Sequence, residues 1–326
     1  MTTILVTGGA GFIGSNLCRF FLAQGHRVLA VDNLITGRRE NIADLLGNRL
    51  FSFHEVDIAT PEFFEAFKEV PVNYIYNLAC PTGVPNLTTL AEEMMRSCSF
   101  GVFNVFEIAK IHKARVLYSS TAEIYGDPER FPQDENYYGN VDPTGPRSAY
   151  EEGKRFGEAT AVMYVRKYGV DAVIVRIFNT YGPGMSLDDQ RVIPQFIKSV
   201  RDKLPFRIYG TGSQTRSHLY VDDLINGLIT VMEKGTTGEV YNVGSEHPMT
   251  IKELAEMVVE MTRHGAGISF VPHFIADHNG RHPSVEKVKS LGWSQKVHIK
   301  DGLLRMIGAY LVPEKQVVAE GASIKI

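Results

Sequence analysis

The stretch Thr7-Gly-Gly-Ala-Gly-Phe-Ile-Gly14 lies between a short apolar run and the start of a helical pattern. Gly8 permits a tight turn, Gly11 lets the backbone approach a pyrophosphate, and Gly14 allows the helix to pack closely on the strand. The N-terminus of the helix offers amide donors and the positive end of its dipole to phosphate groups. The stretch predicts a dinucleotide-binding loop, and an ordinary glycine-rich turn is the alternative.

A carboxylate about 20 residues further on supports the dinucleotide interpretation. Asp32 closes the second apolar run, where its carboxylate can bind a ribose diol. A carboxylate there disfavours a 2'-phosphate, so we expect NAD as the cofactor. Arg38 and Arg39 follow closely and leave NADP open as the alternative.

Short apolar runs alternate with helical patterns through the first half of the chain. This alternation predicts a parallel sheet with right-handed crossovers, in an α/β, doubly wound Rossmann arrangement. The predicted strands span residues 4–6, 27–31, 51–56, 74–78, 115–119 and 172–176, with helices at 15–22 and 92–111.

The rhythm changes after Asn179, where glycine and proline cluster. A helix at 192–201, a strand at 206–209 and a helix at 222–233 predict a smaller α/β substrate-binding lobe. We therefore expect an NAD-binding Rossmann domain over residues 1–178 that carries the catalytic residues. The substrate lobe, interleaved with it, is expected over 179–312 and a C-terminal tail over 313–326.

Composition limits the class of protein. The 326 residues carry a net charge of only -3, which predicts neither nucleic acid nor an anionic membrane as a partner. No apolar run has the length of a membrane span, and the first residues do not resemble a signal peptide. Cys18, Cys80 and Cys98 lack the spacing of a metal site or a disulfide framework, so we expect no metal and a cytoplasmic location.

Tyr150 lies four residues before Lys154, which places both side chains on one face of a helix. The lysine ammonium is expected to lower the phenol pKa, because a nearby positive charge favours phenolate. Ser119-Ser120-Thr121 precedes this pair and adds hydroxyl groups. The constellation predicts a tyrosine base that takes a proton from a sugar hydroxyl while NAD takes a hydride. Two surface residues at a common spacing are the alternative.

Further cofactor contacts are expected where other strands end. Asp57 follows the third strand and could contact adenine, or it could cap the next helix. Asn77-Leu-Ala79 ends the fourth strand and would line the pyrophosphate and the nicotinamide ribose. The complete predicted cofactor set is Gly8, Gly11, Phe12, Ile13, Gly14, Asp32, Asn33, Asp57, Ile58, Leu78, Ala79, Ser119, Tyr150 and Lys154.

Longer segments carry a resemblance to a known family. The chain resembles the extended short-chain dehydrogenase/reductase superfamily over nearly its whole length to about Gly308, and within it the UDP-glucuronate decarboxylases (UDP-xylose synthases). The segments are Ser120-Thr-Ala-Glu-Ile-Tyr-Gly-Asp-Pro128, Tyr138-Gly-Asn-Val-Asp-Pro143, Arg147-Ser-Ala-Tyr-Glu-Glu-Gly-Lys-Arg155, Arg176-Ile-Phe-Asn-Thr-Tyr-Gly-Pro183 and Tyr209-Gly-Thr-Gly-Ser-Gln-Thr-Arg-Ser217.

The resemblance implies roles for individual residues. Thr121 would hydrogen-bond the sugar C4 hydroxyl, Tyr150 would be the base, and Lys154 would tune it and bind the ribose. Glu123 would be the acid/base residue near C5, although a carboxylate here could simply cap a turn. The implied UDP-sugar contacts, in addition to the catalytic Thr121 and Glu123, are Pro81, Asn179, Arg191, Val192, Tyr209, Gln214, Arg216 and Arg281. For Arg216 and Arg281 a surface ion pair is the alternative. The implied assembly is a homodimer joined by helices 92–111 and 150–168.

The implied reaction converts UDP-glucuronate to UDP-xylose. Oxidation at C4 gives a 4-ketone, carbon dioxide leaves, C5 is protonated, and the hydride returns to C4, so NAD is regenerated. Glu123 would need a raised pKa to donate a proton near neutrality, and burial could raise it.

The chain departs from the family pattern at three places, of which the first two touch the sugar end. Ala122 replaces a serine, Thr82-Gly-Val-Pro-Asn86 replaces a Ser-Pro and an aromatic residue, and Cys98 replaces an asparagine and is expected to be buried. A C4 epimerase of the same substrate therefore stays open, although Glu123 argues against it. The adjacent Asp-Glu of a 4,6-dehydratase is absent. A non-catalytic NAD-binding protein is disfavoured because the tyrosine and lysine are both retained.

Overall fold

The computed structural model describes residues 1–272 and 280–311, so the predicted tail lies outside the described residues. Seven parallel strands form the central sheet in the order β11-β6-β5-β4-β1-β2-β3. The order reverses between β1 and β4, which is where doubly wound sheets bind ligands at the carboxyl ends of their strands. The strands are β1 (Thr3–Thr7), β2 (Arg27–Asp32), β3 (Phe51–Glu55), β4 (Tyr74–Asn77), β5 (Arg115–Thr121), β6 (Ala172–Ile177) and β11 (Val240–Val243).

The six strands predicted from the apolar runs are confirmed. Such runs are typical of parallel strands that are buried on both faces. Alternate residues of β1 show this directly, because Ile4 and Val6 join one hydrophobic cluster while Leu5 joins another.

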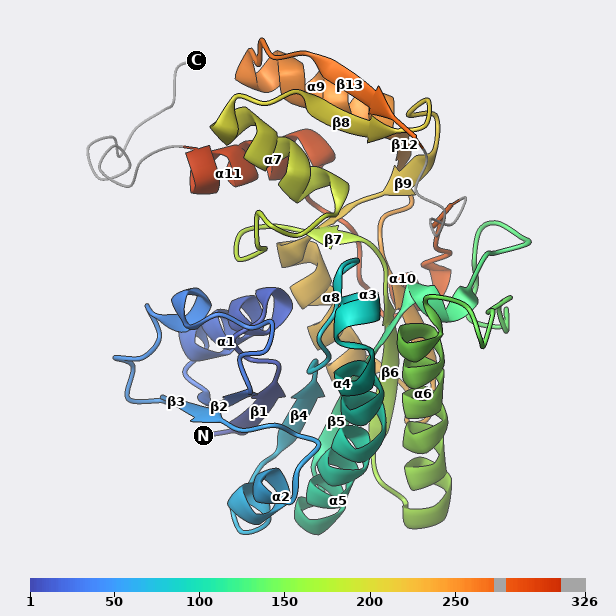
Figure 1. Cartoon of the computed structure of the whole chain (residues 1–326). Coiled ribbons are helices and arrows are strands. Elements are labelled where there is room, and N and C mark those ends of the chain that lie inside the picture. The colour runs from blue at the N-terminus through green and yellow to red at the C-terminus, as the bar shows by residue number, and fades with distance from the viewer. Residues whose placement is uncertain (273–279, 312–326) are drawn as a thin grey trace.

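Helices cover both faces of the sheet (Figure 1). The cluster that contains Ile4 receives α1 and α8, which contact each other, and the cluster that contains Leu5 receives α2, α5 and α6. The helices are α1 (Phe12–Ala23), α2 (Pro61–Phe67), α3 (Asn86–Thr89), α4 (Ala91–Arg96), α5 (Val102–His112), α6 (Ser148–Tyr168), α8 (Val221–Lys234) and α10 (Glu286–Ser290), with short 3-10 turns η1 (Arg39–Ile42) and η3 (Ala122–Tyr125).

The single helix expected over residues 92–111 was wrong in one respect. A π-helical turn, η2 (Ser97–Gly101), separates α4 from α5. Tight packing surrounds this turn, because a Cβ at Gly101 would lie 2.6 Å from Ile58 Cδ1. Such turns inside helices frequently occur at functional sites.

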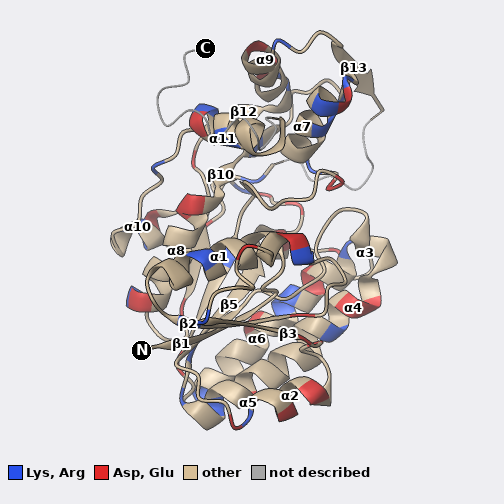
Figure 2. Cartoon of the chain, turned by 90° about the vertical axis from the view of Figure 1, so that its left-hand side faces the viewer, with Lys and Arg blue, Asp and Glu red and all other residues tan. Residues whose placement is uncertain are grey.

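The second part of the chain forms a lobe above the carboxyl edge of the sheet, seen from two sides in Figures 1 and 2. The predicted helix at 192–201, strand at 206–209 and helix at 222–233 are confirmed within α7, β8 and α8. The lobe contains β7 (Thr180–Tyr181), α7 (Val192–Asp202), β8 (Phe206–Tyr209), β9 (Thr215–Ser217), β10 (Leu219–Tyr220), β12 (Pro248–Thr250), α9 (Ile251–Thr262), β13 (Ile268–Val271) and α11 (Ile299–Leu311).

The two parts are interleaved along the chain. After β7, α7, β8, β9 and β10, the chain returns to the sheet with α8 and β11 before it re-enters the lobe at β12. β11 pairs with β6 from Val240 to Val243, so a strand far from the first domain in sequence completes the sheet. The predicted boundary at residue 178 stays a prediction.

Candidate functional site

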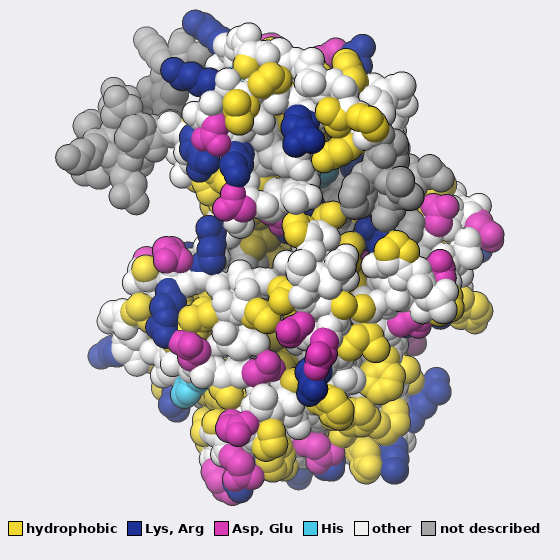
Figure 3. Space-filling model, in the orientation of Figure 1, with side chains coloured by type: hydrophobic (Ala, Val, Ile, Leu, Met, Phe, Trp, Pro, Cys, Tyr) yellow, Lys and Arg dark blue, Asp and Glu magenta, His cyan; other side chains and the backbone are white. Residues whose placement is uncertain are grey.

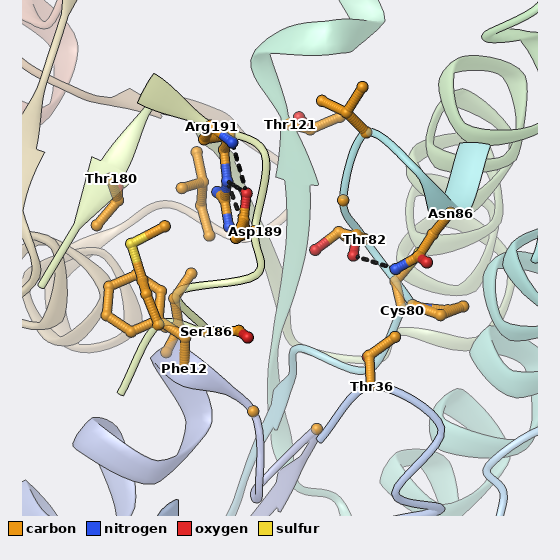
Figure 4. A pocket seen from close by; sticks show the side chains of 18 of the residues that line it. Phe12, Thr36, Cys80, Thr82, Asn86, Thr121, Thr180, Ser186, Asp189 and Arg191 are labelled. Atoms are coloured by element: carbon orange, nitrogen blue, oxygen red, sulfur yellow. Dashed lines mark hydrogen bonds and ion pairs between the residues drawn. The ribbon is translucent and has the colours of Figure 1, made fainter. Parts of the chain in front are cut away.

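A cavity of about 650 Å³ lies between the carboxyl edge of the sheet and the lobe. It opens as a hollow between the two parts in Figure 3, and Figure 4 shows its lining from close by. Every residue predicted for the cofactor and substrate sites lines this cavity. The structure therefore brings them together, while the role of each residue stays a prediction.

The glycine-rich loop leaves no room for side chains. Gly8 has φ +71°, in the left-handed region that favours glycine, and a Cβ there would lie 3.0 Å from Ala79 N. A Cβ at Gly14 would lie 2.0 Å from the carbonyl oxygen of Gly8. The loop and the start of α1 therefore form a backbone cradle of the kind that receives a dinucleotide pyrophosphate.

Asp32 ends β2 and is 8% exposed. Its carboxylate accepts hydrogen bonds from the amides of Ala10 (3.0 Å) and Leu34 (2.9 Å). Burial raises its pKa, and these amide hydrogen bonds oppose the rise. A carboxylate fixed here by the loop fits a ribose diol and opposes a 2'-phosphate.

The two arginines that left NADP open have other partners. Arg38 donates to the carbonyls of Gly184 (3.3 Å) and Met185 (3.5 Å), and Arg39 pairs with Glu55. Both arginines are therefore engaged elsewhere, and Asp32 is the charged group placed for the ribose, which fits NAD and not NADP.

Asp57 does not cap α2, whose N-cap is Thr60, and its contact with adenine stays a prediction. One carboxylate oxygen accepts from the amide of Ala59 (2.8 Å), and the other accepts from the side chain of Asn33 (2.9 Å). Both residues also line the cavity. At the end of β4, Thr7 Oγ1 accepts from the amides of Leu78 (3.2 Å) and Ala79 (3.3 Å), which holds this segment against the loop.

Tyr150 and Lys154 lie on α6, as predicted, but their electrostatics differ from the expectation. Lys154 is 3% exposed, and its Nζ donates to the carbonyl of Ser119 at 2.7 Å. Burial raises the pKa of Tyr150, and a hydrogen bond with Thr121 only partly offsets this rise. The expected lowering of the phenol pKa was wrong for the protein alone, because desolvation is the largest effect and raises the pKa.

Glu123 lies between two guanidinium groups. Arg281 NH2 is 2.9 Å from its Oε2, and Arg147 contacts the same oxygen. Arg281 is 3% exposed, so the interpretation as a surface ion pair was wrong. Two guanidinium groups favour the charged carboxylate, which opposes the expectation that Glu123 itself is a neutral proton donor.

Arg147 is one of the site residues that the sequence interpretation left without a role. It precedes α6 and also binds the buried Glu151 through Nε at 3.0 Å. Its place one helical turn from Glu151, at the head of the helix that bears Tyr150, was the available signal.

The lobe supplies the end of the cavity where the nucleotide contacts are predicted. Arg191 Nε lies 3.0 Å from Asp189 Oδ1, an ion pair that faces the cavity in Figure 4. Gln214 donates to the carbonyl of Tyr209 at 2.9 Å. Arg216 is 8% exposed and donates to the carbonyl of Thr215, so it too is an interior residue.

His218 also lines this end and was assigned no role from sequence. Its Nε2 is buried and has no hydrogen-bond partner among the described residues. Burial, with the charges of Arg216 and Arg191, lowers its pKa to about 4. The imidazole is therefore neutral near pH 7.

Two kinds of feature are absent from residues 1–272 and 280–311. No group of three or more His, Cys, Asp or Glu side chains is placed to hold a metal ion. No helix in these ranges is long and apolar enough to cross a membrane.

Comparisons with known proteins agree with this geometry. The NAD dependent epimerase/dehydratase family matches residues 4–244. The chain is 42% identical to UDP-glucuronic acid decarboxylase 1 of Arabidopsis thaliana over 308 residues, which cover 94% of this chain and 69% of that protein. It is 38% identical to UDP-glucuronic acid decarboxylase 1 of Danio rerio, covering 93% of this chain and 71% of that protein.

Solved structures show the same fold. UDP-glucose 4-epimerase of Thermotoga maritima, solved with UDP-glucose, superposes with a TM-score of 0.88 at 27% identity and covers 97% of this chain and 100% of its own. A mutant UDP-glucuronic acid 4-epimerase of Bacillus cereus, solved with NAD and UDP-4-deoxy-4-fluoro-glucuronic acid, superposes with a TM-score of 0.85 at 27% identity and the same coverage. The glycine loop, Asp32, the Tyr150–Lys154 pair and these matches place the chain in the NAD dependent epimerase/dehydratase family, in the group of its UDP-glucuronic acid decarboxylases.

Proposed function

We propose that this NAD-dependent enzyme decarboxylates UDP-glucuronate to UDP-xylose through a 4-keto intermediate. The observation that carries the proposal is the cluster of Glu123, Arg147 and Arg281 beside Thr121 and Tyr150 in one cavity. Thr121 and Tyr150 would serve the oxidation of a sugar hydroxyl, and Arg147 and Arg281 would bind a sugar carboxylate. The likeness to the named decarboxylases supports the same substrate.

The residues that would hold NAD are the backbone of the Gly8–Gly14 loop, Asp32 and the segment that ends β4. NAD supplies a hydride acceptor for C4 and a positively charged nicotinamide, and a positive charge near a phenol lowers its pKa. Tyr150 then removes the proton of the C4 hydroxyl, with Thr121 as its hydrogen-bond partner.

The sugar chemistry follows from the ketone. A carboxylate β to a ketone loses carbon dioxide readily, because the electrons left at C5 delocalise into an enolate. Thr121 and protonated Tyr150 donate hydrogen bonds to the C4 oxygen, where the negative charge develops.

Glu123 has a different task from the one expected. Two uncompensated guanidinium groups would stabilise the sugar carboxylate and oppose the loss of carbon dioxide. The negative charge of Glu123 offsets them, so the carboxylate is oriented without being held too strongly. The proton for C5 then comes from a water molecule that Glu123 holds.

A C4 epimerase is the second candidate. Ala122 is buried and offers no hydroxyl to hold the sugar carboxylate, and the superposed Bacillus cereus protein is a UDP-glucuronic acid 4-epimerase. Both reactions would share the first oxidation at C4.

The test is incubation of the purified chain with UDP-glucuronate and NAD, followed by mass spectrometry and proton NMR. Loss of carbon dioxide with a UDP-pentose spectrum supports decarboxylation. Unchanged mass with new C4 coupling constants makes the chain an epimerase. No change in either readout rejects the substrate.

A homodimer is a further part of the proposal. Exposed apolar side chains gather on α4, η2, α5 and α6, in the lower right of Figure 3. They are Met95, Phe100, Phe103, Ile111, Phe156 and Tyr168. Such a patch is typical of an interface between subunits. Sedimentation of the unaltered chain and of Phe100→Glu tests it, since a charge in the patch should give monomers.

A cytoplasmic location is proposed on the basis of the cysteines. All three are free thiols, as is usual in a reducing compartment. Fractionation of cells that express the chain tests this assignment.

A further inference from the structure

Cys80 and Cys98 are in contact beside the catalytic helix, and the proposed reaction uses neither thiol. Their Sγ atoms lie 3.8 Å apart, although 18 positions separate them in the chain. Cys80 follows β4 and lines the cavity, as Figure 4 shows, whereas Cys98 lies buried in the π-helical turn η2. The fold thus brings two thiols from separate elements together at the wall of the cavity.

The pair is electrostatically activated. A hydrogen bond from Cys80 lowers the pKa of Cys98 against the effect of burial, and the charge of Lys154 acts in the same direction. The shared proton correspondingly raises the pKa of Cys80. A thiolate stabilised by a lysine and a neighbouring thiol is the nucleophilic form of cysteine.

Packing determines which cysteine can move. A Cβ at Gly153 would lie 3.2 Å from Cys98 Cβ, so Cys98 is pressed against the helix that carries Tyr150 and Lys154. A disulfide needs sulfur atoms about 2.05 Å apart, so the pair must close by almost 2 Å. Cys80 has to make most of this movement, and it follows Ala79, whose amide is held by Thr7 at the glycine loop.

We propose that Cys80 and Cys98 form a peroxide-sensitive dithiol whose oxidation to a disulfide reversibly inactivates the enzyme. The thiolate of the pair attacks one oxygen of hydrogen peroxide, the O–O bond breaks, and a sulfenic acid forms, while the departing hydroxide takes a proton from solvent and leaves as water. The second thiol attacks that sulfur, the S–S bond forms, the S–O bond breaks, and a second water leaves. The two sulfurs lose two electrons and the peroxide gains them.

The oxidation would disturb both partners of the pair. It removes the thiolate next to Lys154 and pulls the segment that ends β4 away from the glycine loop. A dithiol at rest and a transient disulfide under oxidation fit the behaviour of cysteines in a reducing compartment.

Peptide mapping of the full chain provides the first test. Cleavage by trypsin after Arg19, Lys68, Arg96 and Lys110 leaves the three cysteines on separate peptides, residues 1–19, 69–96 and 97–110. After hydrogen peroxide and alkylation of the remaining thiols, we expect the second and third peptides joined, with two hydrogens fewer than their sum. The first peptide, with Cys18, should be alkylated. This readout needs no substrate, so it stands even if the proposed reaction fails.

Activity provides the second test, with each variant normalised to its own untreated rate. Peroxide should inactivate the unaltered chain and Cys18→Ser equally, and dithiothreitol should restore both. Cys98→Ser should form no joined peptide and should lose activity at least tenfold more slowly. Absence of the joined peptide overturns the proposal, as do equal inactivation rates with Cys98→Ser or full activity in the joined form.

Discussion

The two halves of the cavity are formed by different kinds of chemical group. The cofactor half, formed by the Gly8–Gly14 loop, Asp32 and Ala79, is shaped by main-chain groups and by the absence of side chains. The sugar half, formed by Thr121, Glu123, Arg147, Tyr150 and Arg281, is shaped by charged and hydroxyl side chains from distant segments. The first half should therefore be sensitive to added atoms, and the second to removed charges and hydroxyls.

The Tyr150→Phe substitution should have the largest effect, and it should affect turnover but not NAD binding. Removal of the base should lower kcat about 10³-fold, because general acid–base groups contribute about 10²–10⁴. NAD affinity should change little, since the cradle of the cofactor half is backbone. Steady-state kinetics and NAD titration measure both effects, and a parallel loss of NAD binding would contradict the division.

A change at Glu123 tests the charge balance of the sugar half. Glu123→Gln leaves Arg147 and Arg281 without their shared counter-charge, which should cost about 3 kcal/mol of folding stability and about 10² in turnover. The control is Glu152→Gln, which breaks the half-exposed pair with Arg155 and should cost less than about 1 kcal/mol. Urea unfolding compares the two, and equal costs would show that Glu123 is a surface charge.

The converse test adds one methyl group to the cofactor half. Gly14→Ala places a Cβ 2.0 Å from the carbonyl of Gly8, so the loop must shift at a cost of about 2 kcal/mol. NAD affinity should fall about 30-fold. Gly47→Ala is the control, because nothing lies within 4 Å of a Cβ there. Calorimetric titration with NAD that shows no difference between the two variants would contradict a cradle made by close packing.

The smallest effect concerns pH. Because burial lowers the pKa of His218 to about 4, the unfolded chain binds a proton that the folded chain does not as pH falls below about 6.5. The free energy of unfolding is unaffected by His218 above that pH. It decreases as the pH falls toward 4, by about 2 kcal/mol at pH 5. His218→Phe should reduce this loss by that amount, whereas the exposed His247→Gln should leave it unchanged. Urea midpoints at about pH 7.5 and 5 measure the difference.

The comparison of the halves also explains what the sequence could predict. The loop, the strand that follows each helix and the place of Asp32 are set by local patterns, so they were found. The sugar half depends on contacts between residues 123, 147 and 281, which lie too far apart in the chain for any spacing to reveal them. The spacing of Arg147 from Glu151 indicated only a helical ion pair, and Arg281 could not be distinguished from a surface residue.

The sequence also did not predict the direction of the Tyr150 pKa shift. The spacing of Tyr150 and Lys154 correctly gave a shared helix, yet burial reversed the expected direction of the phenol pKa. In the same way, the helical periodicity over 92–111 was correct, but it is interrupted at η2, where the chain packs closely against Ile58 and Gly153. Desolvation and steric contact both depend on the assembled fold.

The return of α8 and β11 to the sheet has a consequence for engineering. The lobe is not a cassette that could be exchanged between relatives by one cut and one ligation. A chimera that imports a foreign lobe needs one junction after β6, one on either side of the α8–β11 passage, and one on either side of α10, which packs on β11. Recombination at a single crossover point would take one part of the sheet or of the lobe from one relative and the remaining part from the other.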